Sequence, residues 1–506
     1  MLSKISVSLG RRSARSESAA FAADSRSVVS LAPWLIALSV VVWIAATTAS
    51  STAQWGDHFE QFAWAHSIQW GYHKHPPLPT WILAGVIHFL GASPLWPTWL
   101  AAACMLGTAF FSYRIASELY GREVAALSLL LLSLAHAYSA RASLYNHNSM
   151  MLLTVSGAVW CVLLALGPER RPVIWCLAGT AAALAVLSKY QAVVPLAGAV
   201  LALWLAGDLD DRRHRRGLLL AVLVALALLT PHLLWLAQGH AAAVDYATQQ
   251  GRALSAAERL WNVTSFLAQQ LRYMIGPLVL FGLLAVMPGS RPWRRRASDW
   301  NRQRAWMCGL VAFPICVTVL IGPLFGIELQ NHWGYQALQF SFLWLAWRLR
   351  PFAPAAGAAW WVSALTVHAV LLAVALVDFG PANAQARNRV DARFPAQGLA
   401  DAVAADWAEN TLCPLRIVVG PMFEASIVSV YNGGAAAVLE EGDFRKSPWV
   451  LPADIERLGA VYIASDPALL PHEGVSTLNW MEVGGGARGP ARRLHWAIIP
   501  PGSCAP

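Results

Sequence analysis

The sequence has few charged residues and very few lysines. Only 13% of its 506 residues are charged, whereas 57% are hydrophobic and the mean hydropathy is +0.46. Soluble domains carry about 25% charged residues, so this composition excludes an ordinary soluble protein and indicates a membrane protein. Lys4, Lys74, Lys189 and Lys446 are the only lysines beside 33 arginines, so each lysine is informative.

Other features are missing too. No internal repeat pairs the two halves of the chain, as it does in many transporters, and the C-terminal region has no Gly-x-Gly-x-x-Gly fingerprint of a dinucleotide site. The net charge of +9 does not indicate nucleic-acid binding, because the arginines form short clusters between apolar stretches, where membrane topology explains them.

Cysteine is sparse, with seven residues in the chain. Five of them lie in apolar stretches and are most simply core residues. Cys413 and Cys504 lie in the polar C-terminal tail, where they could form a disulfide if the tail occupies an oxidising compartment. The sequence alone leaves that pairing open.

Apolar stretches recur along the first three quarters of the chain. A helix needs roughly 20 residues to cross a bilayer, and we predict about eleven crossings. They fall near 31–49, 97–114, 124–140, 148–167, 173–188, 190–207, 217–236, 272–288, 306–325, 335–348 and 355–378. The shorter segment 79–92 is predicted to be interfacial or re-entrant.

The first apolar run has a competing interpretation as a signal peptide. It is too long and begins too late after the N-terminal arginines for that, so we expect a retained first helix. Counting crossings places six arginine-rich segments on one side, which the positive-inside rule makes cytoplasmic. Residues 1–30 are therefore predicted to be cytoplasmic, 31–378 to form the transmembrane domain, and the loop 50–96 and the tail 379–506 to face the other side.

The tail differs from the rest of the chain. "LRIVVG" (415–420) and "AVYIAS" (460–465) are typical of short buried strands, and "FEASIVSVY" (423–431) and "ADIERLG" (453–459) of helices. This order predicts a small α/β domain with a mostly parallel sheet. The predicted fold class is thus an all-α polytopic membrane protein with a C-terminal α/β domain. The tail shows no catalytic constellation.

The stretch "GDHFEQFAWAHSIQWGYHKHPPL" (56–78) gathers many titratable groups beside a membrane segment. A helix that starts after Gly56 would place Asp57 and Glu60 on one face, where one carboxylate can orient or perturb the other. The two prolines at 76 and 77 favour non-helical backbone at His75. Lys74 and His75 are therefore candidate anion ligands at the end of the loop.

Further polar residues are predicted on the same side of the membrane. Arg141 and Asn148 lie in the turn "RASLYNHNS", Lys189 in "SKY" and His332 in "NHWGYQ". Taken singly, they are explained equally well as helix caps, interfacial groups or snorkelling side chains. Together they indicate a polar cavity at one membrane face. Charged residues within a membrane are costly, so such a cavity is a candidate functional site. A divalent metal is conceivable, but no ligand spacing is diagnostic.

The pattern from Asp57 through Gly71, Tyr72, His75, Pro76 and Pro77 resembles the first periplasmic loop of GT-C glycosyltransferases of family 39. That group includes protein O-mannosyltransferases, the aminoarabinose transferase acting on lipid A, and rhizobial galacturonosyltransferases of lipid A and core. "LSKYQAVVPL", "PHLLWLAQ" and "NHWGYQAL" resemble later segments of the family. The resemblance covers roughly residues 30–350.

The sequence departs from the family pattern at three positions. His58 stands where a Glu is frequent, Lys74 replaces the usual acid before His75, and Asn148 stands where many members have a second Asp. These differences put a metal site of the family kind in doubt. They would also fit a subgroup with a different donor or acceptor.

The resemblance implies a bacterial inner-membrane enzyme that transfers a sugar from a polyprenyl phosphate to a lipid, glycan or protein in the periplasm. Asp57 would be the general base, and Glu60 would orient Asp57 or tune its pKa. Lys74, His75, Lys189 and Arg141 would stabilise the leaving phosphate, with Arg272 as a further candidate, and Tyr72, Asn148 and His332 would line the pocket. The donor's lipid tail would lie in a groove between helices, and the tail domain would cover the site or help to choose the acceptor.

Two rival hypotheses remain at this point. A polytopic transporter would also have many crossings and polar groups, but here the charges cluster in loops on one side rather than at mid-membrane. A membrane scaffold with a binding tail would leave the loop chemistry unexplained.

Overall fold

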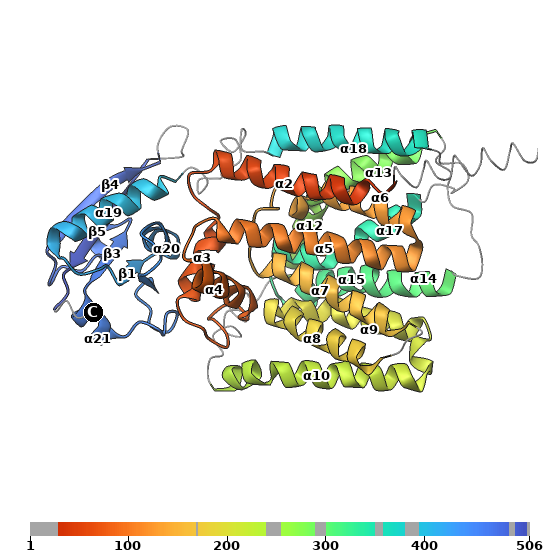
Figure 1. Ribbon diagram of the computed structural model, residues 1–506, viewed down its shortest axis with the longest axis horizontal. Coiled ribbons are helices and arrows are strands. Elements are labelled where there is room, and N and C mark those ends of the chain that lie inside the picture. The colour runs from red at the N-terminus through yellow and green to blue at the C-terminus, as the bar shows by residue number, and fades with distance from the viewer. Residues whose placement is uncertain are drawn as a thin grey trace, which may run out of the picture.

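The computed structural model describes residues 29–167, 171–238, 255–288, 300–349, 358–379, 394–484 and 491–502. Its long helices run side by side along the longest axis of the molecule and form a bundle (Figure 1). Two short helices, α3 (Gly56–Ala65) and α4 (Leu78–Leu90), lie at one end of the bundle, and a unit that contains a sheet lies beyond them. Half of the predicted site residues belong to α3 or to the loop that joins it to α4.

Six helices of the described residues are long and apolar enough to cross a membrane, which confirms a multi-pass membrane protein. Five are formed by α2 (Ala32–Ser50), α5 (Trp96–Tyr120), α7 (His147–Ala165), α10 (Arg212–Ala237) and α18 (Ala358–Phe379). The sixth combines α14 (Trp300–Met307), the π-helix η4 (Cys308–Ala312) and α15 (Phe313–Phe325). A seventh results if α12 (Ala256–Tyr273) and α13 (Ile275–Val286), bent by 60°, count as one span.

The prediction of about eleven crossings is not confirmed. The remaining predicted crossings fall on helices too short to span by themselves, namely α6 (Arg122–Ser133), α8 (Pro172–Ser188), α9 (Val193–Leu205), α16 (Gly334–Leu338) and α17 (Ser341–Leu349). Hydropathy overestimated their length because turns interrupt the apolar runs. The turn η1 (His136–Tyr138) follows α6, for example, and Lys189 lies between α8 and the turn η2 (Tyr190–Ala192).

Small residues let some of these helices pack closely. A Cβ atom added at Gly198 of α9 would lie 2.1 Å from the carbonyl oxygen of Gly309 in η4. One added at Gly179 of α8 would lie 2.3 Å from the carbonyl oxygen of Ala221 in α10. Such close backbone approach is how helices associate in a membrane, where there is no hydrophobic driving force between them.

The C-terminal unit is a five-stranded sheet with the order β2-β1-β3-β5-β4. The strands are β1 (Ile417–Gly420), β2 (Ala437–Glu440), β3 (Ala460–Ala464), β4 (Thr477–Val483) and β5 (Arg492–Ile499). The first three pair in parallel, and β5 and β4 add antiparallel pairs. The two predicted strands match β1 and β3, whereas the prediction of a mostly parallel sheet is wrong because two antiparallel strands complete it.

Helices cover both faces of the parallel strands. Ile417 and Val419 of β1 pack in a cluster with α21 (Pro452–Leu458), and Val418 between them belongs to the large core that includes α19 (Ala396–Asn410) and α20 (Met422–Tyr431). This alternation explains why the strand is apolar at every position. The helices α20 and α21 match the two that the sequence predicts.

The cysteines divide as the composition suggests. Cys104, Cys161, Cys176, Cys308 and Cys316 are free. Cys413 is disulfide-bonded. Cys504, its predicted partner, lies outside the described residues.

Candidate active site

Helix α3 is attached to the turn that precedes α7 by three hydrogen bonds. Trp55 Nε1 donates to Ser143 Oγ at 3.0 Å, and the backbone N–H of Tyr145 donates to His58 Nε2 at 2.9 Å. The third bond joins Asn146 to Asp57. As predicted, α3 starts at Gly56, and these bonds join its first turn to the turn before α7. Burial lowers the pKa of His58 to about 3, so its neutral ring can accept the bond.

Asp57 lies in the first turn of α3 and is exposed. Its Oδ2 accepts a hydrogen bond of 2.7 Å from Asn146 Nδ2. The Oδ1 of the same Asn146 caps α7 by accepting from the backbone N–H groups of Asn148 and Ser149. The Asn146 amide therefore fixes the carboxylate relative to the start of α7. An oriented carboxylate that solvent or a ligand can reach is suited to accept a proton.

Glu60 forms an ion pair with Lys74. Lys74 Nζ lies 2.7 Å from Glu60 Oε1. Burial raises the pKa of Glu60 to about 7, while the charge of Lys74 opposes the shift and that of Asp57 reinforces it. The sequence prediction assigned Glu60 to the general base and Lys74 to the leaving phosphate. The structure instead pairs these two residues and so joins the two ends of the loop.

The C-terminal unit reaches the same pair. Glu440, the last residue of β2, is buried and interacts electrostatically with Lys74. Its Oε2 lies 3.8 Å from His73 Nε2, and its Oε1 lies 3.9 Å from Lys446 Nζ. Burial raises the pKa of Glu440. The tail thus contributes a carboxylate beside the loop, which the sequence reasoning missed because nothing in the tail marks it.

Aromatic side chains of the C-terminal unit pack against α3. The ring of Phe59 packs edge-to-face against Phe423 of α20, with centroids 5.2 Å apart, and lies 6.4 Å from Tyr431. Phe59 is fully buried. Figure 1 shows α20 beside α3 at this junction. The C-terminal unit is therefore packed directly against α3.

Lys189 lies between α8 and η2 and is buried. Its Nζ donates a hydrogen bond of 2.6 Å to Asn148 Oδ1 at the start of α7. Burial lowers the pKa of Lys189 to about 7, although the charge of Asp57 acts in the opposite direction. The structure therefore brings three predicted site residues together: Asp57, Lys189 and Asn148.

His75 lies on non-helical backbone before the two prolines, as predicted. Its ring centroid is 4.1 Å from that of His147. The Nε2 of His147 lies 3.2 Å from the Pro76 carbonyl oxygen, so this nitrogen carries the proton and donates it. Burial lowers the pKa of His75 well below its usual value, and the nearby charge of Lys189 adds to this effect. His75 is thus a neutral hydrogen-bonding group.

His332 belongs to the turn η5 (Asn331–Trp333) and also faces this region. It interacts electrostatically with His75, Lys189 and Arg141. Burial, followed by the charge of Lys189, lowers the pKa of His332 to about 3. His332, a predicted pocket residue, therefore lies near His75 and Lys189 although it comes much later in the chain.

Glycine at position 71 has a clear steric reason. A Cβ atom there would lie 2.4 Å from the indole ring of Trp235 in α10. His232, one turn earlier on α10, lies with Nδ1 2.5 Å from the Trp70 carbonyl oxygen and with Nε2 3.1 Å from the Tyr190 hydroxyl. Because a carbonyl only accepts, Nδ1 donates and Nε2 accepts. The segments "GYHKHPPL", "SKY" and "PHLLWLAQ" therefore meet in space.

Tyr72 supports the loop from within. Its side chain is only 3% exposed and stacks on Trp64 with ring centroids 5.0 Å apart. Its hydroxyl donates to the Ser67 carbonyl oxygen at 2.9 Å. The prediction placed Tyr72 in the pocket, whereas the structure places it in the packing of the loop.

Arg141 lies over the ring of Trp55, with its guanidinium carbon 5.5 Å from the ring centroid. It interacts electrostatically with His332 and with Tyr335 of α16. Tyr335 also interacts electrostatically with Asp57. Arg141 therefore belongs to the same electrostatic environment as Asp57 and Lys189. Arg272, the further phosphate candidate, is exposed in the last turn of α12.

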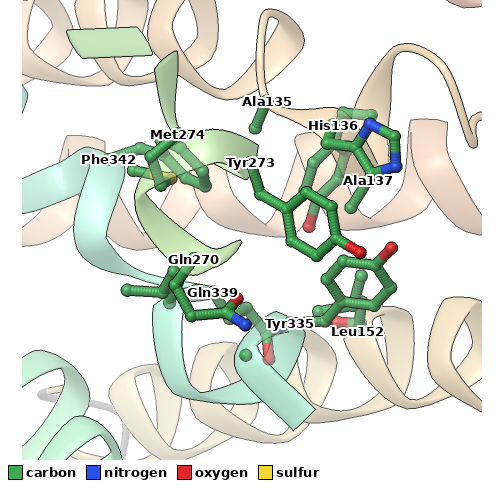
Figure 2. A pocket seen from close by; sticks show the side chains of 13 residues that line it. Ala135, His136, Ala137, Leu152, Gln270, Tyr273, Met274, Tyr335, Gln339 and Phe342 are labelled. Atoms are coloured by element: carbon green, nitrogen blue, oxygen red, sulfur yellow. The ribbon is translucent and has the colours of Figure 1, made fainter. Parts of the chain in front are cut away.

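A small cavity of about 30 Å³ lies beside this region (Figure 2). Tyr273 and Tyr335 face each other across it, with ring centroids 5.9 Å apart, and His136 stacks on Tyr273 at 4.5 Å. Gln270 lines the cavity and donates from Nε2 to the Asn331 carbonyl oxygen at 2.9 Å. Sequence reasoning missed His136, Tyr273 and Tyr335. Only their spacing to helix ends could have indicated them.

A larger cavity of about 570 Å³ shares three lining residues with the small one, namely Gln270, Met274 and Leu338. Its walls are mostly apolar and come from α12, α13, η4, α15 and α17. Within the described residues, no group of three or more His, Cys, Asp or Glu side chains is arranged to hold a metal ion.

Comparison with known proteins identifies relatives of this arrangement. A family model described as dolichyl-phosphate-mannose-protein mannosyltransferase matches residues 74–235. The lipid A galacturonosyltransferase RgtD of Rhizobium johnstonii is 21% identical over 318 residues, which are 62% of this chain and 65% of that protein. The match therefore spans slightly less than two thirds of this curated relative.

Two solved structures share the fold over most of the chain. ArnT from Cupriavidus metallidurans bound to undecaprenyl phosphate superposes with a TM-score of 0.53 and 16% identity, covering 91% of this chain and 97% of ArnT. The apo state of the same protein gives 0.50 and 15%, covering 91% and 96%. These findings confirm the predicted resemblance to GT-C glycosyltransferases and give no support to the transporter hypothesis.

Proposed function

We propose that this membrane glycosyltransferase of the GT-C fold moves a sugar from a polyprenyl-phosphate donor to an acceptor hydroxyl. The observation that carries the proposal is the convergence of Asp57 and Lys189 at the start of α7. An oriented carboxylate and a buried cation are the two groups that displacement of a phosphate by a hydroxyl requires. Each comes from a separate segment, and only the fold brings them together.

Asp57 acts as the general base. The acceptor oxygen forms a bond to the anomeric carbon, the bond from that carbon to the phosphate oxygen breaks, and the acceptor proton passes to the Asp57 carboxylate. The electron pair of the broken bond leaves with the lipid phosphate. A single displacement of this kind inverts the anomeric centre. Asn146, whose amide donates to Asp57 Oδ2 at 2.7 Å, positions the base.

Lys189 binds the departing phosphate. Its pKa of about 7 rises when a phosphate dianion or monoanion lies beside it, because an opposite charge favours the charged amine. His75 and His332 remain neutral and supply hydrogen bonds. Arg141 contributes further positive charge, since its guanidinium lies over Trp55 in the same region. Lys74 is held by Glu60 and acts on the phosphate from farther away.

The apolar cavity of about 570 Å³ accommodates part of the donor's lipid chain. Gln270 and Met274 line both this cavity and the one in Figure 2, so the phosphate end of the chain would lie on the side of Tyr335, which interacts electrostatically with Arg141 and Asp57. ArnT, which shares the fold, has been crystallised with undecaprenyl phosphate, and this supports a polyprenyl-phosphate donor.

The acceptor is a lipid, glycan or protein hydroxyl. The likeness to a lipid A galacturonosyltransferase favours lipid A or another envelope glycan. The site faces the periplasm of a bacterial inner membrane, with residues 1–30 in the cytoplasm and 379–506 in the periplasm, since the basic loops then lie inside. The C-terminal unit, packed through Phe59 and Phe423, forms one wall of the acceptor entrance.

The test is an assay of the purified protein in lipid nanodiscs with labelled polyprenyl-phosphate sugars and crude envelope lipids. The wild type should transfer label to an acceptor. Asp57→Asn, which keeps the shape of the side chain, should reduce kcat by about 10²–10⁴-fold, the usual contribution of a general base. Asp401→Asn, a change at an exposed position of α19, is the matched control. Unchanged transfer by the Asp57 variant would refute the base assignment.

A further inference from the structure

A second cavity lies between the starts of α8 and α10, away from the candidate active site. Its volume is about 260 Å³, and Trp175 and Leu220 are among its walls. Trp175 precedes Lys189 by 14 residues along the chain, which corresponds to roughly 20 Å at 1.5 Å per helical residue. This cavity therefore belongs to the opposite end of α8 and has no part in the proposed transfer reaction.

The basic sequence "RRHRR" at the start of α10 supplies the polar side of the cavity. Arg213 and Arg216 are three residues apart, so they project from one face of the helix. Gly217 follows on that face, and a Cβ atom there would lie 2.2 Å from Trp175 Nε1. Glycine thus lets the two helices approach until the indole forms one wall and the arginines another.

The side chains of Arg213 and Arg216 have no ion-pair partner within the described residues, and both are exposed. Arg215, on a different face, instead donates to the carbonyl oxygens of Leu209 and Asp210 at 2.7 and 3.1 Å. The helix therefore uses one arginine to hold the preceding turn. It leaves two others at the cavity.

His214 provides a second, independent observation. It lines the cavity and is only 8% exposed. Its Nδ1 lies 2.8 Å from the Asp208 carbonyl oxygen and so donates to it. The buried Nε2 has no hydrogen-bond partner in the described part of the chain. Because Nδ1 already makes this bond, Nε2 is the ring atom left to bond with a ligand, and a buried polar atom without a partner is costly.

We propose that this cavity binds the head group of an anionic phospholipid with a hydroxylated head, such as phosphatidylglycerol. Arg213 and Arg216 would bind the phosphate, to which guanidinium groups donate bidentately. His214 Nε2 would accept a hydrogen bond from the head-group hydroxyl. The position fits a lipid, because α10 is a candidate membrane span and these residues lie in its first two turns.

The surface beside the cavity fits acyl chains rather than a soluble anion. Leu219, Val222, Leu223 and Leu226 follow the arginines on α10 and are exposed large apolar side chains. A free phosphate would leave this surface unused, whereas a phospholipid would cover it. The proposal therefore commits to a lipid and predicts that inorganic phosphate alone does not replace it.

The test uses the full-length protein in detergent and measures its unfolding temperature as lipid is added. Phosphatidylglycerol, phosphatidylcholine and inorganic phosphate are the three probes. The double variant Arg213→Gln/Arg216→Gln removes the proposed phosphate ligands. Arg122→Gln/Arg348→Gln removes the same charge from exposed residues at the ends of α6 and α17, outside the cavity, and is the matched control.

We expect phosphatidylglycerol to raise the unfolding temperature of the wild type and of the control, and phosphatidylcholine to have less effect. The cavity variant should require roughly tenfold or more phosphatidylglycerol for the same shift, as expected when a charge-assisted contact is lost. Native mass spectrometry should show retained phosphatidylglycerol in the wild type. Equal responses of the two double variants, or an equal shift with inorganic phosphate, would overturn the proposal. Both measurements are independent of glycosyl transfer.

Discussion

Lys189 Nζ donates a hydrogen bond of 2.6 Å to Asn148 Oδ1, which joins the break between α8 and η2 to the first turn of α7. The partner is a neutral amide. Many glycosyltransferases of family 39, which the sequence resembles, have an acid at this position. A neutral partner leaves the buried amine without a counter-charge in direct contact. The pKa of Lys189 is accordingly lowered to about 7, with Asp57 as the main opposing charge.

The first prediction concerns the pH dependence of transfer. If charged Lys189 is needed for the phosphate, kcat/KM should fall as pH rises through about 7, because the amine then loses its proton. Asn148→Asp should shift this fall in kcat/KM to a pH about 1–2 units higher, since an adjacent opposite charge raises the pKa of a lysine. The pH profile of kcat/KM with excess acceptor measures it.

Asn148→Ala is the control for this prediction, because it removes the hydrogen bond without adding charge. The fall in kcat/KM should not shift to higher pH in that variant. For kcat, which reports on the donor-bound enzyme, the fall should lie at higher pH than for kcat/KM. An Asn148→Asp profile that coincides with the wild type would show that another group titrates.

The second prediction concerns stability and Glu60. Its pKa is raised from 4.5 to about 7, so the folded state holds this proton more tightly than the unfolded state does. The associated stability is fully present below pH 4.5 and is lost as pH rises through about 7, by up to about 3 kcal/mol at 1.36 kcal/mol per pKa unit. Glu60→Gln should remove this part of the pH dependence, measured as the difference in unfolding free energy between variant and wild type.

Lys74 offers the companion experiment. Lys74→Met removes the charge that lowers the Glu60 pKa, so the pH at which stability is lost should move upwards. The double variant Glu60→Gln/Lys74→Met should be less destabilised than the two single changes together, because neither leaves the other unpaired. Strict additivity would mean that the pair at 2.7 Å contributes no coupling energy.

Much of the loop could be predicted from the sequence, because its signals are local. Gly56 begins a helix, and the two prolines keep His75 off one. The pairing of Lys74 with Glu60 was not predictable in the same way. The two residues are 14 positions apart, and the loop must fold back before they meet. Glu440 is hundreds of residues away, so only tertiary packing places it beside Lys74.

The number of crossings could not be read from hydropathy for a related reason. Residues such as Leu127 to Leu132 in α6 are fully or almost fully buried among other helices and do not face lipid. A short buried helix and part of a span have the same composition. The strand β4 was missed because most of its residues are exposed and its pairing depends on β5.

The third prediction tests why glycine stands at position 71. In Gly71→Ala the new methyl group would lie 2.4 Å from the ring of Trp235, so the loop or the ring must move. Overpacking of this kind costs about 1–3 kcal/mol. The unfolding temperature should fall and the donor KM should rise. Gly71→Ala/Trp235→Leu should recover part of the donor KM, whereas Gly85→Ala in α4, which has open space at its Cβ, should behave as wild type.

The last prediction distinguishes binding of the donor's lipid chain from the transfer chemistry. Ala312 lines the cavity of about 570 Å³, and Ala312→Trp should fill much of the space where the donor chain is proposed to lie. The KM for a long-chain polyprenyl-phosphate sugar should rise by roughly tenfold or more, because apolar contact is lost at about 25 cal/mol per Å². A donor analogue with a chain of one or two isoprene units should be used almost as well as by the wild type, since it does not reach the cavity. Val370→Trp, at an exposed apolar position of α18, is the matched control and should affect neither donor. A rise in KM that is equal for both chain lengths would place the defect at the sugar or phosphate and would contradict this location for the chain.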